Sequence, residues 1–403
     1  MNYFLIFMFA IQAVVGAYLG WRFRWAFGAV MPSWLRVWYV FWPIVALVVT
    51  SFPLAHFSSR RLGLELPPAL LFITALLYGA LVIGFATVLI TDVFGLIARR
   101  LPFMHAVCAH VRNHPHRLGF FILIIIALLV AWGLYQAHTP RETHFALTVH
   151  KPLKNGAKQL RIVQLSDLHV GRFSSATLVQ EMVARVNRLQ PDLIFFTGDV
   201  IDNSVKPYFD QEMPRILGEL QSRYGVYAIM SNHDYFSESP QLNIDAYTRS
   251  NMRVLRDEIF YLEELGITLI GRDDWIRGTR QLPPGASPDL TSKRAPLAVL
   301  TAHADPMTPW ILLDHQPREI DEAIAQKIDL QFSGHTHNGQ FFPFNFVVKH
   351  IYRNTWGQLT QDAYTLIVSC GFGTWGPPLR LLSYAEIVVA DVLFQPPPAS
   401  SPF

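Results

Sequence analysis

The chain has 403 residues, of which 51% are hydrophobic and only 16% are charged, so it is long enough for two or more domains and too apolar for an ordinary soluble protein. Its formal net charge is +3, and its basic residues do not gather into the stripes with which nucleic-acid-binding proteins neutralise phosphates, so no nucleic acid partner is expected. The two cysteines, Cys108 and Cys370, lie far apart without a C-x-x-C spacing, which supports neither a disulfide framework nor a zinc knuckle.

Apolar residues cluster in the first 140 positions. Four stretches there approach or exceed the roughly 20 residues that span a bilayer. They are about Tyr3 to Gly20, Trp38 to Phe57, Pro67 to Ile90 and Gly119 to Gln136. The first stretch lacks the basic start and the clear small-residue cleavage site of a secretory signal, so we expect it to be retained. Residues 1–140 are therefore predicted to form an all-α transmembrane domain of four helices.

The basic residues of the short loops indicate how these helices cross the membrane. The first and third loops contain seven arginines, at positions 22, 24, 36, 99, 100, 112 and 117, whereas the second loop contains Arg60 and Arg61. The positive-inside rule then places the first and third loops in the cytoplasm, and both termini on the outer or periplasmic face of an inner membrane. Arg141, Lys151 and Lys154 follow the last span and favour the opposite orientation.

The composition becomes polar after Gln136. Residues 141–159 are expected to form a linker and a first hairpin, with Lys-Asn-Gly at 154–156 as a turn between two short strands. From residue 160 on, helical patterns such as "SATLVQEMVARVNRLQP" alternate with the strand-like runs "RIVQL", "DLIFF", "VYAIM", "TLIG", "LAVL", "WILL", "DLQF", "TLIVS" and "EIVVADV". This alternation predicts an α/β domain over residues 160–393, followed by a disordered tail at 394–403.

Five polar clusters each follow one of these strands directly. They are "SDLH", "TGDVID", "SNHD", "DHQP" and "SGHTH". Ligand sites in α/β sheets form beyond the carboxyl ends of the strands, so five separate segments are able to meet at one point. The sequence therefore predicts a single site at this edge.

The side chains of these clusters are carboxylates, an amide and imidazoles, with no thiolate. This donor set suits borderline divalent metals such as Mn, Fe, Zn, Co or Ni. Six or more ligands are too many for one tetrahedral zinc and enough for two ions that share a carboxylate. Two such ions are able to clamp a phosphoryl oxygen and to acidify a bridging water into a hydroxide that attacks phosphorus.

The order D-x-H, G-D-x-x-D, N-H-D, H and G-H-x-H resembles the motifs of the calcineurin-like metallophosphoesterase family. The resemblance extends over roughly Leu160 to Val392 and implies a layered β-sandwich flanked by helices. It also implies a first metal held by Asp167, His169, Asp199 and His337. The second metal would be held by Asp199, Asn232, His315 and His335.

Two further residues of these motifs are implied to act on substrate without binding metal. His233 matches the histidine that protonates the leaving oxygen or stabilises the transition state. Asp202 matches the acid that orients this histidine, although it could equally cap the following turn. The downstream segment "YTLIVSCGFGTWGPPLRLLSYAEIVV" is similar to the closing segment of the membrane-attached or exported branch of the family. Arg380 within it is a candidate for binding substrate phosphate or for pairing with Glu386.

Three positions depart from the family pattern. Ser231 stands where a glycine is usual, and Asn338 replaces a common glycine after the last ligand. Asn203 occupies the position at which phosphoprotein phosphatases carry an arginine that grips phosphate, so that branch is disfavoured.

Other histidines offer competing interpretations. His303, in "TAHADP", also follows a strand-like run, but we favour His315 because "ILLDHQP" resembles the family's strand-His-x-Pro element. Four histidines between the third and fourth spans, at positions 105, 110, 114 and 116, could form another metal cluster. Their arginine neighbours favour a solvated segment that faces lipid headgroups.

The function predicted from the sequence is a membrane-anchored, dinuclear metal-dependent hydrolase of a phosphodiester, pyrophosphate or phosphomonoester bond. Because four spans are more than a tether requires, we expect a lipid-linked substrate. A phosphodiesterase of soluble nucleotide-type substrates is one alternative. A transport or signalling protein with a ligand-binding metal domain is another. Transport sites normally need ionisable groups within the spans, and the only obvious ones here, Asp92 and His56, both lie near span ends.

Overall fold

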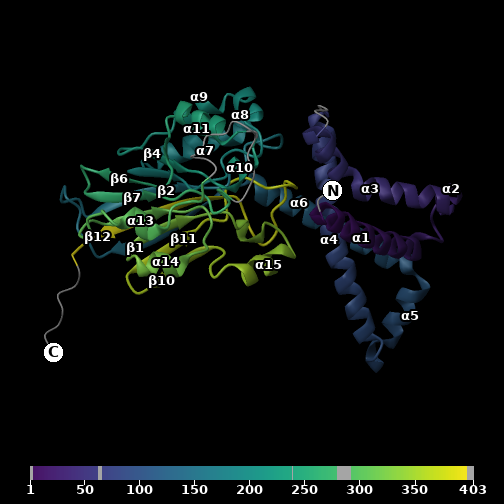
Figure 1. Cartoon of the computed structure of the whole chain (residues 1–403). Coiled ribbons are helices and arrows are strands. Elements are labelled where there is room, and N and C mark those ends of the chain that lie inside the picture. Colours follow the sequence, from purple (N-terminus) through teal and green to yellow (C-terminus); the bar gives the residue numbers. More distant parts are fainter. Residues whose placement is uncertain (1–2, 62–65, 238, 279–291, 397–403) are drawn as a thin grey trace. The chain divides into compact units, whose positions relative to one another are not determined.

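The computed structural model describes residues 3–61, 66–237, 239–278 and 292–396 (Figure 1). It divides into two compact units, each of which is described here by itself. The helical unit comprises Met1–Tyr135 together with Gly376–Leu381, and the sandwich unit comprises Gln136–Trp375 and Leu382–Phe403.

The helical unit is built from long apolar helices. They are α1 (Tyr3–Phe27), α3 (Trp38–Arg61), α4 (Pro68–Ala98) and α6 (Pro115–His138), with the shorter α2 (Ser33–Arg36), η1 (Pro102–Met104) and α5 (His105–Asn113) between them. Small residues allow the helices to approach closely, as is common in membrane bundles. A Cβ atom added at Gly119 would lie 2.7 Å from the ring of Phe27, and one at Gly16 would lie 2.8 Å from Val49.

Among the described residues, three helical stretches are long and apolar enough to cross a membrane: Trp38–Ala55, Pro68–Ala98 and Pro115–His138. They coincide with the second, third and fourth predicted spans. The first predicted span, about Tyr3 to Gly20, falls in α1, and the side chains of its residues 3–8 lie outside the described part of the chain.

Two six-stranded sheets form the sandwich unit. The first has the order β1 (Arg141–Val149), β12 (Glu386–Phe394), β2 (Gln159–Leu165), β3 (Leu193–Phe196), β4 (Val226–Ile229) and β5 (Arg253–Leu255). The second has the order β10 (Gly357–Gln361), β11 (Tyr364–Val368), β9 (Leu330–Ser333), β8 (Trp310–Leu313), β7 (Ile267–Gly271) and β6 (Glu258–Leu262). Strands β2 to β5 run parallel to one another, as do β7, β8, β9 and β11.

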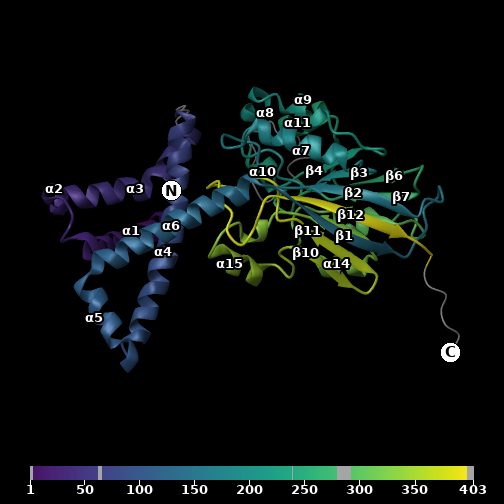
Figure 2. The same cartoon turned by 180° about the vertical axis from the view of Figure 1, so that it is seen from behind.

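Three apolar clusters define the layers of this unit. The cluster between the sheets contains Phe195 of β3 and Phe332 of β9, whose ring centroids are 5.4 Å apart. A second cluster lies under α7 (Ala176–Arg188), α9 (Met213–Gly218) and α11 (Pro240–Arg249), on the outer face of the first sheet. A third lies under α13 (Leu297–Thr301) and α14 (Ile320–Ala325) on the second sheet. Figure 2 shows this order of layers from behind, and the predicted layered α/β sandwich is confirmed.

Two sequence-based expectations are wrong. The strands β1 and β2 do not form a hairpin, because β12 lies between them, parallel to β1 over nine residue pairs and antiparallel to β2. The apolar run "LAVL" is helix α13 rather than a strand, since Pro296 precedes it at the N-cap and a run of four apolar residues does not distinguish a strand from a buried helical turn. Strand β12 extends to Phe394, and residues 397–403 of the predicted disordered tail lie outside the described residues.

Candidate metal centre

The five polar clusters meet beyond the carboxyl ends of parallel strands of both sheets. Three leave the first sheet after β2, β3 and β4, and two leave the second after β8 and β9. A hydrogen bond joins the sheets at this edge, since the Gln164 side-chain amide of β2 donates to the Ser333 carbonyl of β9 at 2.8 Å. The same amide donates to Thr197 Oγ1, directly after β3 of its own sheet, at 2.9 Å. The site is therefore built by the tertiary packing of two sheets.

The backbone is in the left-handed region at five of the predicted ligands. The φ angles are +53° at Asp167, +46° at His169, +50° at Asp199, +71° at His335 and +49° at His337. This region costs a non-glycine residue about 1–2 kcal/mol, and such strain gathers where function requires a particular side-chain direction. No sequence pattern signalled these angles.

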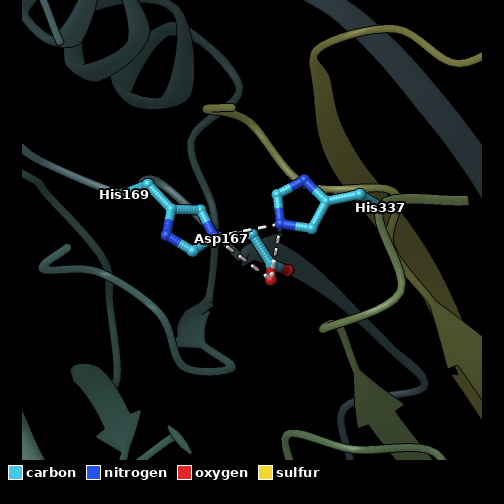
Figure 3. Close-up of side chains that lie close together, drawn as sticks. All are labelled: Asp167, His169 and His337. Carbon is cyan, nitrogen blue, oxygen red and sulfur yellow. Dashed lines mark hydrogen bonds and ion pairs between the residues drawn. The ribbon is translucent and has the colours of Figure 1, made fainter. Parts of the chain in front are cut away.

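The first group of ligands is Asp167, His169 and His337 (Figure 3). The Nε2 atoms of the two histidines face each other at 3.0 Å, and Asp167 Oδ1 lies 3.3 Å from His337 Nε2 and 4.0 Å from His169 Nε2. All three residues are buried. Two imidazole nitrogens and a carboxylate converging on one point fit a divalent cation.

The second group is arranged around the amide oxygen of Asn232, the first residue of α10 (Asn232–Phe236). His315 Nε2 lies 3.1 Å and His335 Nδ1 lies 3.0 Å from Asn232 Oδ1. His315 Nδ1 is 2.7 Å from the carbonyl oxygen of Thr197, so this contact fixes the ring and leaves Nε2 directed at the site.

Asp199 lies between the two groups. Its Oδ2 atom is 3.6 Å from His169 Nε2 of the first group and 3.3 Å from His315 Nε2 of the second. A carboxylate in this position is able to bridge two ions, as the sequence resemblance implies.

His233 and Asp202 lie next to these groups. His233 Nδ1 is 2.9 Å from Asp202 Oδ1, and the ring of His233 is 4.6 Å from that of His169. The backbone N–H of His233 donates to Asp199 Oδ1 at 3.3 Å. The carboxylate thus lies directly beside the histidine ring at the edge of the centre.

Glycine is required where the loops approach each other most closely. Gly198 has a φ of +98°, and a Cβ atom there would lie 2.5 Å from His315 Nδ1. A Cβ atom at Gly334 would overlap Ser166 Oγ and Asp167 Oδ2. Asn338, in η2 (His337–Gly339), has a φ of +48°. Glycine adopts this left-handed conformation without strain, which explains why it is common at this position in the family, and asparagine tolerates it better than most other residues.

Ser231 has a function in the structure that the sequence did not reveal. Its hydroxyl accepts a hydrogen bond from the backbone N–H of Asp199 at 2.8 Å and donates one to Asp234 Oδ2 at 2.7 Å. Asp234 is fully buried and also accepts from Asn243 Nδ2 and from the Tyr247 hydroxyl. The serine therefore connects the loop of the shared carboxylate to a buried polar network.

The electrostatics of the cluster favour bound cations. Burial alone raises the pKa of Asp167 and of Asp199, but nearby histidines lower both values well below the usual range. Burial and the charge of His315 lower the pKa of His335 to about 3, which leaves a neutral imidazole. Ligands must be deprotonated to bind metal, and these three residues satisfy that condition at neutral pH.

His315 and His233 show the opposite trend. Burial lowers the pKa of His315, but Asp199 and Asp167 raise it to about 10, so a bound cation would displace a proton there. Burial likewise opposes charge on His233, while Asp199 and Asp202 raise its pKa to about 9. These carboxylates thus favour the protonated form of His233, which is able to donate a proton.

Other candidate residues named from the sequence are also described by the structure. Arg380 is fully buried and belongs to the Gly376–Leu381 segment of the helical unit, where its backbone N–H donates to the Gly133 carbonyl at 3.0 Å. Glu386 accepts hydrogen bonds from Ser369, Cys370 and Trp356. His303 is exposed after α13. The histidines at 105, 110, 114 and 116 are exposed or half-buried.

Known proteins resemble this chain over the same region. The profile of the family described as calcineurin-like phosphoesterase matches residues 160–339. An uncharacterized metallophosphoesterase of Aquifex aeolicus is 31% identical over 280 residues, which cover 67% of this chain and 98% of that protein. An uncharacterized metallophosphoesterase of Campylobacter jejuni is 30% identical over 277 residues, covering 68% of this chain and 69% of that protein.

A vertebrate protein is similar as well. A zebrafish protein described as a transmembrane protein with metallophosphoesterase domain is 32% identical over 289 residues, covering 69% of this chain and 63% of that protein. The chain thus spans less than two thirds of the length of this relative.

Proposed function

Because the chain belongs to the calcineurin-like metallophosphoesterase family, whose members are phosphoester hydrolases that use two divalent metal ions, we propose that it is a membrane-anchored hydrolase of a lipid-linked phosphoester. The bond cleaved is a phosphodiester, a pyrophosphate or a phosphomonoester. The two divalent ions come from the set Mn, Fe, Zn, Co and Ni.

The observation that carries this proposal is the position of Asp199. Its Oδ2 atom lies 3.6 Å from His169 Nε2 and 3.3 Å from His315 Nε2, one histidine of each ligand group. Its Oδ1 atom accepts a hydrogen bond from the backbone N–H of His233. A shared carboxylate between two sets of nitrogen and oxygen donors is the arrangement expected for a pair of ions. We assign Asp167, His169 and His337 with Asp199 to one ion, and Asn232, His315 and His335 with Asp199 to the other.

Two bound divalent cations supply Lewis-acid activation of water and of phosphoryl oxygens. The chain's own residues do the rest. His233, protonated and oriented by Asp202, is placed to donate a proton to the departing oxygen. The strained loops hold the ligand side chains in fixed directions, so little reorganisation is needed when substrate binds. The assignment of Arg380 to substrate phosphate stays a prediction.

A lipid-linked substrate is supported by the membrane helices. Three helical stretches that are long and apolar enough to span a bilayer are more than a single tether requires, which supports a substrate at the membrane. The alternative to a lipid-linked substrate is a soluble nucleotide-type substrate, which would be hydrolysed by the same chemistry. Transport is less favoured, because Asp92 is paired with Arg22 at 2.6 Å and accepts from the Tyr18 hydroxyl at 2.6 Å, as in a structural ion pair.

The test uses the purified full-length protein loaded with Mn²⁺. We expect hydrolysis of bis(4-nitrophenyl) phosphate, loss of turnover on chelation and recovery on metal addition. A panel of nucleotides, pyrophosphate and phospholipids in nanodiscs would then identify the substrate class. Metal binding without turnover on any member of this panel would contradict the proposal.

We further propose that the sandwich unit faces the outer side of a bacterial inner membrane, as the arginine distribution predicts. A phosphatase-type reporter fused after Phe403 is expected to be active in a bacterial host, and a fluorescent reporter that folds only in the cytoplasm is expected to be dark. The reverse pattern would place the centre in the cytosol.

A further inference from the structure

Helix α15 (Phe344–Ile351) has the opposite polarity to a normal surface helix. A helix on a soluble domain buries its apolar side chains and exposes its polar ones. Here the buried side chain is Asn345, which is 4% exposed. Four apolar side chains face outward instead, with exposed fractions of 43% for Phe344, 56% for Phe346, 51% for Val347 and 58% for Ile351. We call these four side chains the α15 surface.

The helix is held rigidly to the loop of the candidate metal centre. Asn345 Nδ2 donates to the carbonyl oxygen of Asn338 at 2.6 Å, one residue after the ligand His337. A Cβ atom at Gly339 would overlap the backbone of Asn345, so the turn and the helix are in direct contact. Helices α10 and α15 lie at the same end of the sandwich unit in both views (Figures 1 and 2). Whatever covers the α15 surface is therefore close to the centre.

Two more exposed apolar side chains are attached to the same turn. The side chain of Gln340 forms hydrogen bonds with the backbone N–H and carbonyl of Trp375, both at 2.8 Å, and Asn338 Nδ2 donates to the carbonyl of Leu382. Trp375 is 60% and Leu382 is 70% exposed. Each is joined by one peptide bond to the segment Gly376–Leu381, which belongs to the helical unit.

The chemistry of this region fits the surface of a bilayer. Phenylalanine and tryptophan are favoured at the membrane interface, and an interfacial helix combines an apolar face with basic residues that meet anionic headgroups. Lys349 and His350 are exposed on α15 and supply the basic residues. The same chain contains helices that are long and apolar enough to cross a membrane.

We propose that the α15 surface docks into the interface of a bilayer containing anionic lipid and presents the metal centre to lipid headgroups. This inference rests on the proposed function only for the nature of the substrate. The docking itself depends on the exposed side chains of α15.

Matched probes at two exposed helical valines test the docking. Val347 lies on α15, and Val299, which is 62% exposed, lies on α13. Each is replaced by cysteine in the full-length protein lacking Cys108 and labelled with an environment-sensitive fluorophore; Cys370 is 1% exposed and is left in place. The labelled proteins are placed in nanodiscs of phosphatidylcholine and phosphatidylglycerol that contain spin-labelled lipid.

We expect the spin-labelled lipid to quench the probe at position 347 and to leave the probe at 299 unaffected. Ile351→Asp should reduce quenching at 347 to the level at 299, whereas Met307→Asp, at an exposed residue of the same unit, should not. Replacing phosphatidylglycerol by phosphatidylcholine should weaken the quenching at 347. Equal quenching at 347 and 299, or none at 347, would overturn the docking.

Turnover of bis(4-nitrophenyl) phosphate by the same labelled proteins separates this inference from the proposed function. Hydrolysis without quenching at 347 refutes the docking alone. Quenching at 347 without hydrolysis supports the docking and refutes the proposed activity. Ile351→Asp is expected to leave hydrolysis of this soluble ester within about twofold, because Ile351 is exposed and is not one of the proposed ligands, and exposed substitutions usually change folding stability by no more than ~0.5 kcal/mol.

Discussion

The apolar layer between the two sheets and the loop edge that it supports are built on opposite principles. In the layer, side chains such as Phe195, Ile162 and Phe332 are fully buried on regular strands, and every local preference agrees with the fold. At the edge, Asp167 and Asp199 are buried charges on left-handed backbone, which cost free energy unless a cation compensates them. The sandwich is thus a rigid support whose stability tolerates a destabilised edge.

Removing the shared carboxylate should have the largest effect on function. Asp199→Ala is expected to empty at least one metal site and to reduce turnover by at least about 10²-fold, because one side chain contacts both ligand groups. Metal content by mass spectrometry and turnover of an aryl phosphodiester check this. Full occupancy of both sites in Asp199→Ala would rule out the bridge.

Removing His233 should separate chemistry from metal binding. His233→Ala is expected to retain both metals and to slow turnover by roughly 10²- to 10⁴-fold, as for a lost general acid. Replacing the exposed His303 by alanine is the matched control and should leave both quantities unchanged. Loss of metal in His233→Ala would show that this histidine is a ligand.

The apolar layer is tested by truncating a central side chain. Phe195→Ala is expected to destabilise the protein by about 3–5 kcal/mol, because it leaves a cavity between the sheets. Thermal unfolding in detergent measures the change. Turnover per folded, metal-loaded molecule should stay close to that of the parent, and a large loss there would show that the layer and the edge are not separable.

Ser231 should give the smallest effect, and it lies where the two regions join. Ser231→Gly leaves the buried N–H of Asp199 without its acceptor, which costs about 1–3 kcal/mol. We expect a lower unfolding temperature and weaker metal binding. Ser237→Gly, at the other end of α10, is the control and should change metal affinity less. Equal effects of the two substitutions on metal affinity would contradict the connection through Ser231.

Much of this organisation was predictable from local patterns. Runs such as "RIVQL" and "DLIFF" identified buried strands because burial on both faces requires continuous apolar residues, and these runs are β2 and β3. The ordered polar clusters after the strands indicated which side chains would meet, and the structure brings Asp167, Asp199 and His335 together. The short run "LAVL" failed because four apolar residues carry no period that separates helix from strand.

The tertiary structure decided what depends on contacts between distant segments. Strand β12 lies between β1 and β2 in the sheet, although it is far from both in the sequence. Such long-range pairing depends on the whole sheet, so the residues near position 150 do not predict it. The left-handed angles at His169 and His337, the Ser231 link and the outward apolar face of α15 follow in the same way from packing. Local sequence determines which residues prefer burial and which are able to bind metal, whereas the free energy of the whole fold determines where each side chain is directed.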